Sequence, residues 1–131
     1  MKKIISASTA SIGIIIILSL LIIFHLLVLV DIVPYQVVWG GRIESKSQLS
    51  KFEIFSVCIN LFMILLVCVK SGFLKILMNQ KVLQISLWLM CVLFVLNTIG
   101  NLLSVNMIEK IVFTPITIIL AFLSLRLAIA K

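Results

Sequence analysis

The sequence predicts an all-α integral membrane protein that folds as a four-helix transmembrane bundle. The chain has 131 residues, of which 63% are hydrophobic and only 11% are charged, and its mean hydropathy is +1.38. A soluble domain is about 45–50% apolar and about 25% charged. This composition excludes a soluble enzyme, a disordered chain and a nucleic-acid-binding protein, and it indicates the lipid bilayer as the partner of the helix surfaces.

Four apolar stretches are long enough to cross a bilayer, since about 30 Å of hydrocarbon requires roughly 20 helical residues. They predict helices over about 4–31, 51–70, 80–104 and 107–130. Little chain remains between them, so residues 1–131 form a single transmembrane domain. Backbone polar groups in lipid must be satisfied within helices, which favours one bundle.

The first stretch is expected to stay in the protein rather than to be removed as a signal peptide. Its uninterrupted apolar run, 12–30, exceeds the usual 7–15 residues of a signal-peptide core, and no A-x-A-like cleavage site follows it. Small residues recur four positions apart in its first half, at Ser6/Ala10, Ala7/Ser11 and Thr9/Gly13. Such a face allows another helix to approach closely, either in the same chain or in a second copy.

Local signals place the ends of the second helix. Ser50-Lys51-Phe52-Glu53 matches a capping box, in which the first and last side chains satisfy free amides at a helix start. Gly72 suits the C-terminal cap of the same helix.

Pro115 leaves two starts open for the fourth helix. A start at Thr114 places Pro115 at the first helical position. It also leaves only about 16 residues, or roughly 24 Å, which is short for a span. We therefore favour a start near Asn106, with a kink at Pro115.

The distribution of charge predicts the orientation. Seven of the eleven basic residues fall on one side of the four spans: Lys2, Lys3, Lys70, Lys75, Lys81, Arg126 and Lys131. The other side carries the remaining four basic residues and all four acidic ones: Arg42, Lys46, Lys51, Lys110, Asp31, Glu44, Glu53 and Glu109. Positive charge favours the cytoplasm, so we expect both termini inside and the net charge of +7 on the cytoplasmic face.

Polar side chains within the spans are costly in lipid and are candidate functional residues. Six of them fall in the predicted outer half of the bilayer: His25, Asn60, Asn97, Asn101, Thr114 and Thr117. All four predicted helices contribute, which predicts a polar cluster or pocket open to the outside. The alternative is a set of hydrogen bonds between helices that only stabilises the bundle.

The loop between the first two spans has two interpretations. Its aromatic residues suit an anchor at the membrane interface, followed by a Gly-Gly turn. It could instead form a lid over the polar pocket, made of Tyr35, Trp39, Arg42, Glu44 and Glu53.

Several chemistries lack their required residues. Cys58, Cys68 and Cys91 include no C-x-x-C pair, which argues against thiol–disulfide exchange. One histidine, with no carboxylate deep in a span, provides no ligand set for a metal, and no cofactor motif is present. The first span has no carboxylate before Asp31, unlike that of the small multidrug exporters.

Three segments carry a resemblance. They are Pro-Tyr-x-x-Val-Trp-Gly-Gly-Arg at 34–42, Leu-Asn-Thr-Ile-Gly-Asn at 96–101 and Phe-Thr-Pro-Ile-Thr at 113–117. Together they resemble small uncharacterised bacterial membrane proteins with four transmembrane helices. The resemblance spans nearly the whole chain and implies this architecture and a bacterial inner membrane, but no particular activity.

Three functional classes remain, in order of preference. The first is a binding or accessory membrane protein that uses the outward-facing polar cluster. The second is a small oligomeric transporter or channel. The third is a membrane enzyme that uses His25 with Glu53 or Glu44 on a lipid-like substrate. A homo-oligomer or a larger membrane complex is compatible with each of them.

Overall fold

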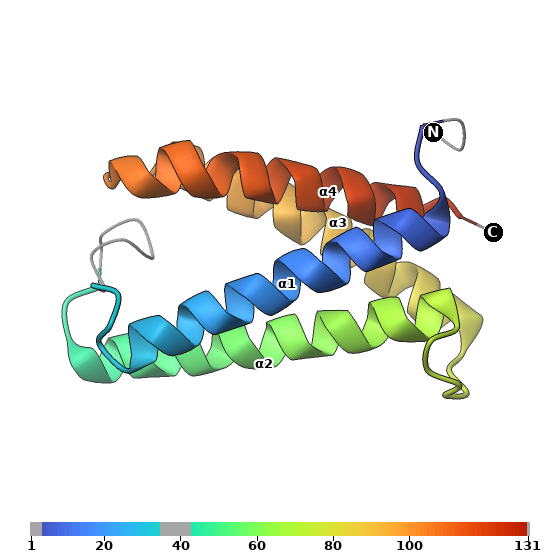
Figure 1. The fold of residues 1–131 in the computed structure, drawn as a ribbon, viewed down its shortest axis with the longest axis horizontal. Coiled ribbons are helices and arrows are strands. Elements are labelled where there is room, and N and C mark those ends of the chain that lie inside the picture. The colour runs from blue at the N-terminus through green and yellow to red at the C-terminus, as the bar shows by residue number, and fades with distance from the viewer. Residues whose placement is uncertain (1–3, 35–42, 131) are drawn as a thin grey trace.

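The computed structural model describes residues 4–34 and 43–130 and is all-helical (Figure 1). The helices are α1 (Ala7–Leu29), α2 (Lys46–Ser71), α3 (Gln80–Leu102) and α4 (Thr114–Ala128), the last preceded by the π-helical turn η3 (Glu109–Phe113). With η3 and α4 taken as one span, the described residues provide four helices long and apolar enough to cross a membrane. The predicted fold class is confirmed.

The four helices form two pairs. α1 packs along α2, and α3 packs along α4, while contacts between α1 and α4 join the pairs. α2 and α3 touch each other little, although they are consecutive in the chain. The start of α1 and the end of α4 lie at one end of the bundle, here called the terminal end, and the start of α2 lies at the other, the loop end (Figure 1).

The starts of α1 and α3 are capped by side chains. The Ser6 hydroxyl accepts a hydrogen bond from the amide of Thr9 at 3.0 Å, and the Asn79 side chain accepts one from the amide of Lys81 at 2.9 Å. Such side chains satisfy amides that have no partner within the first turn of a helix.

The predicted capping box of α2 is wrong. α2 begins one and a half turns earlier than expected, because Ser45 caps it and accepts from the amide of Gln48 at 3.2 Å. Gln48 in turn accepts from the amide of Glu44 at 3.0 Å. The predicted end is confirmed: Gly72 is the C-cap, with a left-handed φ of 82° that glycine adopts without strain.

The longer version of the fourth helix is confirmed. The Asn106 side chain accepts hydrogen bonds from the amides of Ile108 at 2.8 Å and Glu109 at 3.3 Å, so the helix begins well before Pro115. The turn just ahead of Pro115 is the π-helical η3. Proline lacks an amide hydrogen and clashes with the carbonyl four residues earlier, and the wider π turn accommodates both effects.

The main hydrophobic core lies toward the terminal end. It contains Ala10, Ile14 and Leu18 of α1, packed with residues of α2, α3 and α4. A Cβ placed on Gly13 would lie 3.1 Å from Cδ1 of Leu123 in α4, so the small residues of α1 serve a close approach within the chain. A smaller cluster around Val28 and Leu49 joins α1 to α2 at the loop end.

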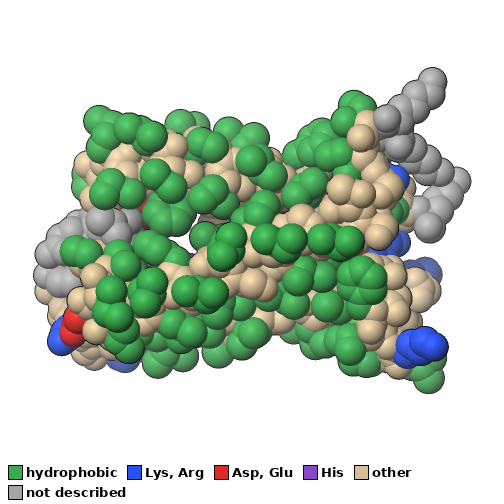
Figure 2. Space-filling view, viewed as in Figure 1, with side chains coloured by type: hydrophobic (Ala, Val, Ile, Leu, Met, Phe, Trp, Pro, Cys, Tyr) green, Lys and Arg blue, Asp and Glu red, His purple; other side chains and the backbone are tan. Residues whose placement is uncertain are grey.

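Hydrophobic side chains cover most of the visible face of the bundle, and Lys and Arg side chains gather at the terminal end (Figure 2). At the loop end, Lys46 and Asp31 form an exposed ion pair at 2.6 Å. An apolar belt with charges at its two ends is the surface expected of a multi-pass membrane protein.

Candidate functional site

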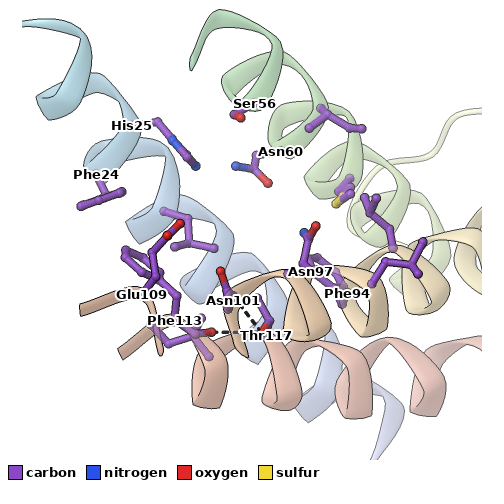
Figure 3. Close-up of a pocket in the computed structure, with 17 residues that line it drawn as sticks. Phe24, His25, Ser56, Asn60, Phe94, Asn97, Asn101, Glu109, Phe113 and Thr117 are labelled. Atoms are coloured by element: carbon purple, nitrogen blue, oxygen red, sulfur yellow. Dashed lines mark hydrogen bonds between the residues drawn. The ribbon is translucent and has the colours of Figure 1, made fainter. Parts of the chain in front are cut away.

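A pocket of about 330 Å³ lies between the two helix pairs. It is lined by residues of α1, α2, α3, α4 and η3, and it has an apolar part that includes Leu21, Met63 and Phe94. Its polar lining residues are His25, Ser56, Asn60, Asn97, Asn101, Glu109 and Thr117 (Figure 3). Five of the six residues predicted for a polar cluster therefore line one pocket.

Thr114 is the exception among the six. It is buried and does not line the pocket, and within the described residues its hydroxyl has no hydrogen-bond partner. Thr117, three residues further along α4, does line the pocket.

His25 is fixed by Glu53 across the α1–α2 interface. Nδ1 of His25 lies 2.5 Å from Oε2 of Glu53, and the two side chains are 17% and 0% exposed. Glu53 was predicted to belong to the loop lid. The predicted helix over 51–70 already contained it, but α2 begins earlier, at Lys46, so Glu53 lies about two turns inside the helix and faces α1. A buried carboxylate needs such a partner, since an isolated charge is strongly disfavoured in an apolar surrounding.

Two aromatic rings connect His25 to η3. The ring of Phe24 meets the imidazole edge-on at a centroid distance of 5.7 Å and packs on Phe113 at 5.0 Å. Phe24 and Phe113 both line the pocket, so this contact joins the two helix pairs beside it.

Glu109 is a pocket residue that the sequence interpretation counted only as a charge on the outer side. It is 7% exposed and its carboxylate is hydrogen bonded to the hydroxyl of Ser104. A signal was present, because Glu109, Phe113 and Thr117 are spaced four residues apart and share a helix face. Ser56 was also missed, although it lies on the same face of α2 as Asn60.

On the α3–α4 side, polar groups bind one another. Nδ2 of Asn101 donates to the hydroxyl of Thr117 at 3.4 Å, and the Thr98 hydroxyl lies 2.9 Å from the same oxygen. Thr117 donates to the carbonyl of Phe113 at 3.0 Å (Figure 3). These contacts agree with the interpretation that polar residues stabilise the bundle.

Asn60 and Asn97 behave differently. Both line the pocket from α2 and α3 (Figure 3), and within the described residues neither amide hydrogen bonds to another protein group. Asn60 is buried but contains no fully enclosed polar atom without a partner, and Asn97 is exposed. Their amides therefore remain open to the pocket interior.

Most of the predicted lid falls on residues outside the described part of the chain: Tyr35, Trp39 and Arg42. Glu44 is described, and it is exposed just before α2 without lining the pocket. Among described residues no group of three or more His, Cys, Asp or Glu side chains is placed to hold a metal ion.

No protein-family model matches the sequence. No curated protein and no solved structure matches it either. The functional conclusion therefore depends on the geometry of the pocket.

Proposed function

We propose that this protein is a binding or accessory protein of a bacterial inner membrane, which holds a small ligand in the pocket between its two helix pairs. The pocket has the mixed character of a ligand site, with an apolar lining and a few polar groups that converge from separate helices. Its volume of about 330 Å³ falls within the range of small-molecule sites.

One observation carries the proposal: the amides of Asn60 and Asn97 face the pocket without a partner in the described protein. An amide in an apolar surrounding loses free energy unless it is hydrogen bonded. If these residues served only to connect helices, they would bind each other or the backbone, as Asn101 and Thr117 do. A ligand with hydrogen-bonding groups gives them their partners.

The proposed orientation places the termini in the cytoplasm and the pocket in the outer half of the bilayer. It is supported by the Lys and Arg side chains that gather at the terminal end (Figure 2). Lys70 and Arg126 lie at this end, because they donate to the carbonyls of Ala130 and Ile5. Alkaline phosphatase fused after Lys131 is then expected to be inactive, because this reporter folds only outside the cytoplasm. High activity would overturn the orientation.

The binding proposal is tested by extracting small molecules that stay bound to the purified protein and identifying them by mass spectrometry. The wild-type chain is expected to retain a ligand in a fixed ratio, and Asn60→Leu/Asn97→Leu to lose it by about tenfold or more, which corresponds to only about 1.4 kcal/mol.

Thr98→Val is the matched control for this experiment. Thr98 lies next to Asn97 in α3 but does not line the pocket, so its variant is expected to retain the ligand. Retention by the double Asn variant, or a wild-type protein that carries nothing, would contradict the proposal.

The His25–Glu53 pair favours a second candidate, a membrane enzyme that acts on a lipid-like substrate. A histidine oriented by a carboxylate is the arrangement of a general base. The two functions separate when the wild-type protein is compared with His25→Gln: a binding protein leaves its ligand chemically unchanged in both, whereas an enzyme converts its substrate only when His25 is present.

A further inference from the structure

The loop between α2 and α3 presents apolar side chains on both sides of a lysine. Phe73, Leu74, Ile76 and Leu77 are all exposed, and Leu77 is completely so. Lys75, in the middle of the run, is exposed as well. Neighbouring exposed apolar side chains mark a surface that contacts a membrane or another protein.

Contacts at both ends hold this loop in place. After Gly72 ends α2, the amide of Leu74 donates to the carbonyl of Cys68 at 3.1 Å. At the other end Met78 packs against the main hydrophobic core, and the Asn79 side chain caps α3. The exposure of the apolar side chains between these contacts is therefore a property of the folded loop.

The loop lies where the surface of a bilayer is expected. α2 contains 26 residues and is about 39 Å long, which is enough to cross the roughly 30 Å of hydrocarbon and reach the headgroups. In Figure 1 the loop, drawn in yellow-green, turns aside at the end of α2, across the long axis of the bundle. A segment that turns aside at this depth follows the bilayer surface.

The charges around the loop are all positive. Lys75 and Lys81 are exposed, and among the described residues neither has a carboxylate partner. Lys and Arg side chains gather at this end of the molecule (Figure 2). The acidic residues of the chain lie toward the loop end instead: Asp31, Glu44, Glu53 and Glu109. The surface that complements the loop is therefore anionic.

We propose that the α2–α3 loop binds anionic phospholipids, with Leu77 among the upper parts of the acyl chains and with Lys75 and Lys81 against the lipid phosphates. An amphipathic segment at an interface buries its apolar side chains about 5–10 Å below the headgroups. Each lysine held near an anionic surface adds to the attraction. The pocket takes no part in this contact, so the inference does not depend on the proposed ligand.

A soluble acidic protein fits the same surface less well. It would match the lysines, but it would also have to replace lipid around the apolar side chains of the loop. Apolar exposure continues from the loop into the first turns of α3, at Val82 and Ile85. Lipid covers this run without interruption, whereas a soluble partner would have to stop within it.

Lys75→Gln/Lys81→Gln tests the charged part of the contact. The protein in micelles is supplied with phosphatidylglycerol and phosphatidylcholine in equal amounts, and the retained lipids are counted by native mass spectrometry. The matched control is Lys51→Gln/Lys110→Gln, which removes two exposed lysines toward the loop end. All four side chains are exposed, so the bundle is expected to fold in both variants.

We expect the wild-type chain to retain phosphatidylglycerol in preference to phosphatidylcholine. The ratio should fall by about tenfold or more in the loop variant, equivalent to about 1.4 kcal/mol, and by less than about twofold in the control. High salt should lower the wild-type ratio in the same direction, because it screens exposed charges.

A spin label tests the apolar part of the contact. It is attached to Leu77→Cys, or to Glu44→Cys as a water-facing reference, in a chain whose own cysteines are alanine: Cys58, Cys68 and Cys91. In nanodiscs that contain phosphatidylglycerol, oxygen dissolved in the lipid should reach the label at position 77, and an aqueous nickel chelate should not.

Three results would overturn the proposal. They are a wild-type chain without preference for phosphatidylglycerol, an equal loss of preference in the loop and control variants, and a label at position 77 that the nickel chelate reaches. The last result would leave the loop in water, open to a soluble acidic partner. Retention of a pocket ligand is measured separately with Asn60→Leu/Asn97→Leu, so either proposal can fail without the other.

Discussion

The two ends of the bundle use polar side chains in opposite ways. At the terminal end, Nε of Arg126 donates to the carbonyl of Ile5 at 2.7 Å, and Nζ of Lys70 donates to that of Ala130 at 2.9 Å. The Gln84 amide likewise donates to Ala128. Carbonyls at the end of a helix lack partners within it, so two of these contacts close the last turn of α4. Nη1 of Arg126 and the hydroxyl of Ser124 have no hydrogen-bond partner within the described residues.

At the loop end the helix pairs enclose a pocket, and part of their polar surface stays open to it. Asn60 and Asn97 have no partner among the described residues, whereas His25 and Glu53 bind each other within the α1–α2 pair. The comparison indicates that the two ends have different roles. Close packing at the terminal end stabilises the bundle, and this allows the loop end to keep a cavity that packing alone would remove.

The largest effect is expected where the helices approach most closely. Gly13→Leu should lower the free energy of unfolding by about 1–3 kcal/mol, because the new side chain forces α1 away from Leu123. Unfolding in mixed micelles with increasing SDS, followed by circular dichroism, measures the change.

Gly100→Leu is the matched control, since a Cβ at Gly100 in α3 meets nothing within 4 Å. Equal destabilisation by the two leucine variants would show that the terminal end is not the closely packed one.

At the loop end, His25→Leu should cost about 1–3 kcal/mol, because it removes a hydrogen-bond partner from the fully buried Glu53. His25→Leu/Glu53→Leu should recover much of this loss, since replacing both members of a buried pair by apolar residues is often close to neutral. A double variant no more stable than His25→Leu would disprove the coupling in the same unfolding assay.

Lys70→Met tests the closure of α4 at the terminal end. We expect a loss of about 1 kcal/mol, because the carbonyl of Ala130 loses its donor and the site is only half-buried. Lys75→Met removes the same charge from an exposed position in the α2–α3 loop and should leave stability unchanged. Equal unfolding temperatures of the two variants would show that the Lys70 contact does not stabilise the terminal end.

The smallest effect is expected for the open amides. Asn60→Leu and Asn97→Leu should each change stability by no more than about 0.5 kcal/mol, because neither residue has a hydrogen-bond partner to lose among the described residues. Thr117→Val, which removes the hydroxyl bound by Asn101, should cost about 1 kcal/mol. If the asparagine variants are more destabilising than Thr117→Val, Asn60 and Asn97 stabilise the bundle and are not reserved for binding a ligand.

Local sequence determined much of the fold. Apolar length set the four spans, and Asn106 and Gly72 marked helix ends, because these signals act within a few residues and do not depend on the rest of the chain. The depth of polar residues in each span also identified five of the pocket residues, since their distance from the span ends follows from the helical rise.

Tertiary structure decided what lies opposite each residue. Ser50 and Glu53 match a capping box, but Ser45 and Gln48 match the same motif five residues earlier and cap α2. Glu53 then lies inside the helix, and packing of α1 on α2 places it opposite His25. The sequence likewise contains no signal that α2 would pair with α1 while leaving α3 apart. The pocket follows from that pairing, since contacts between distant helices are set by how all four faces pack together.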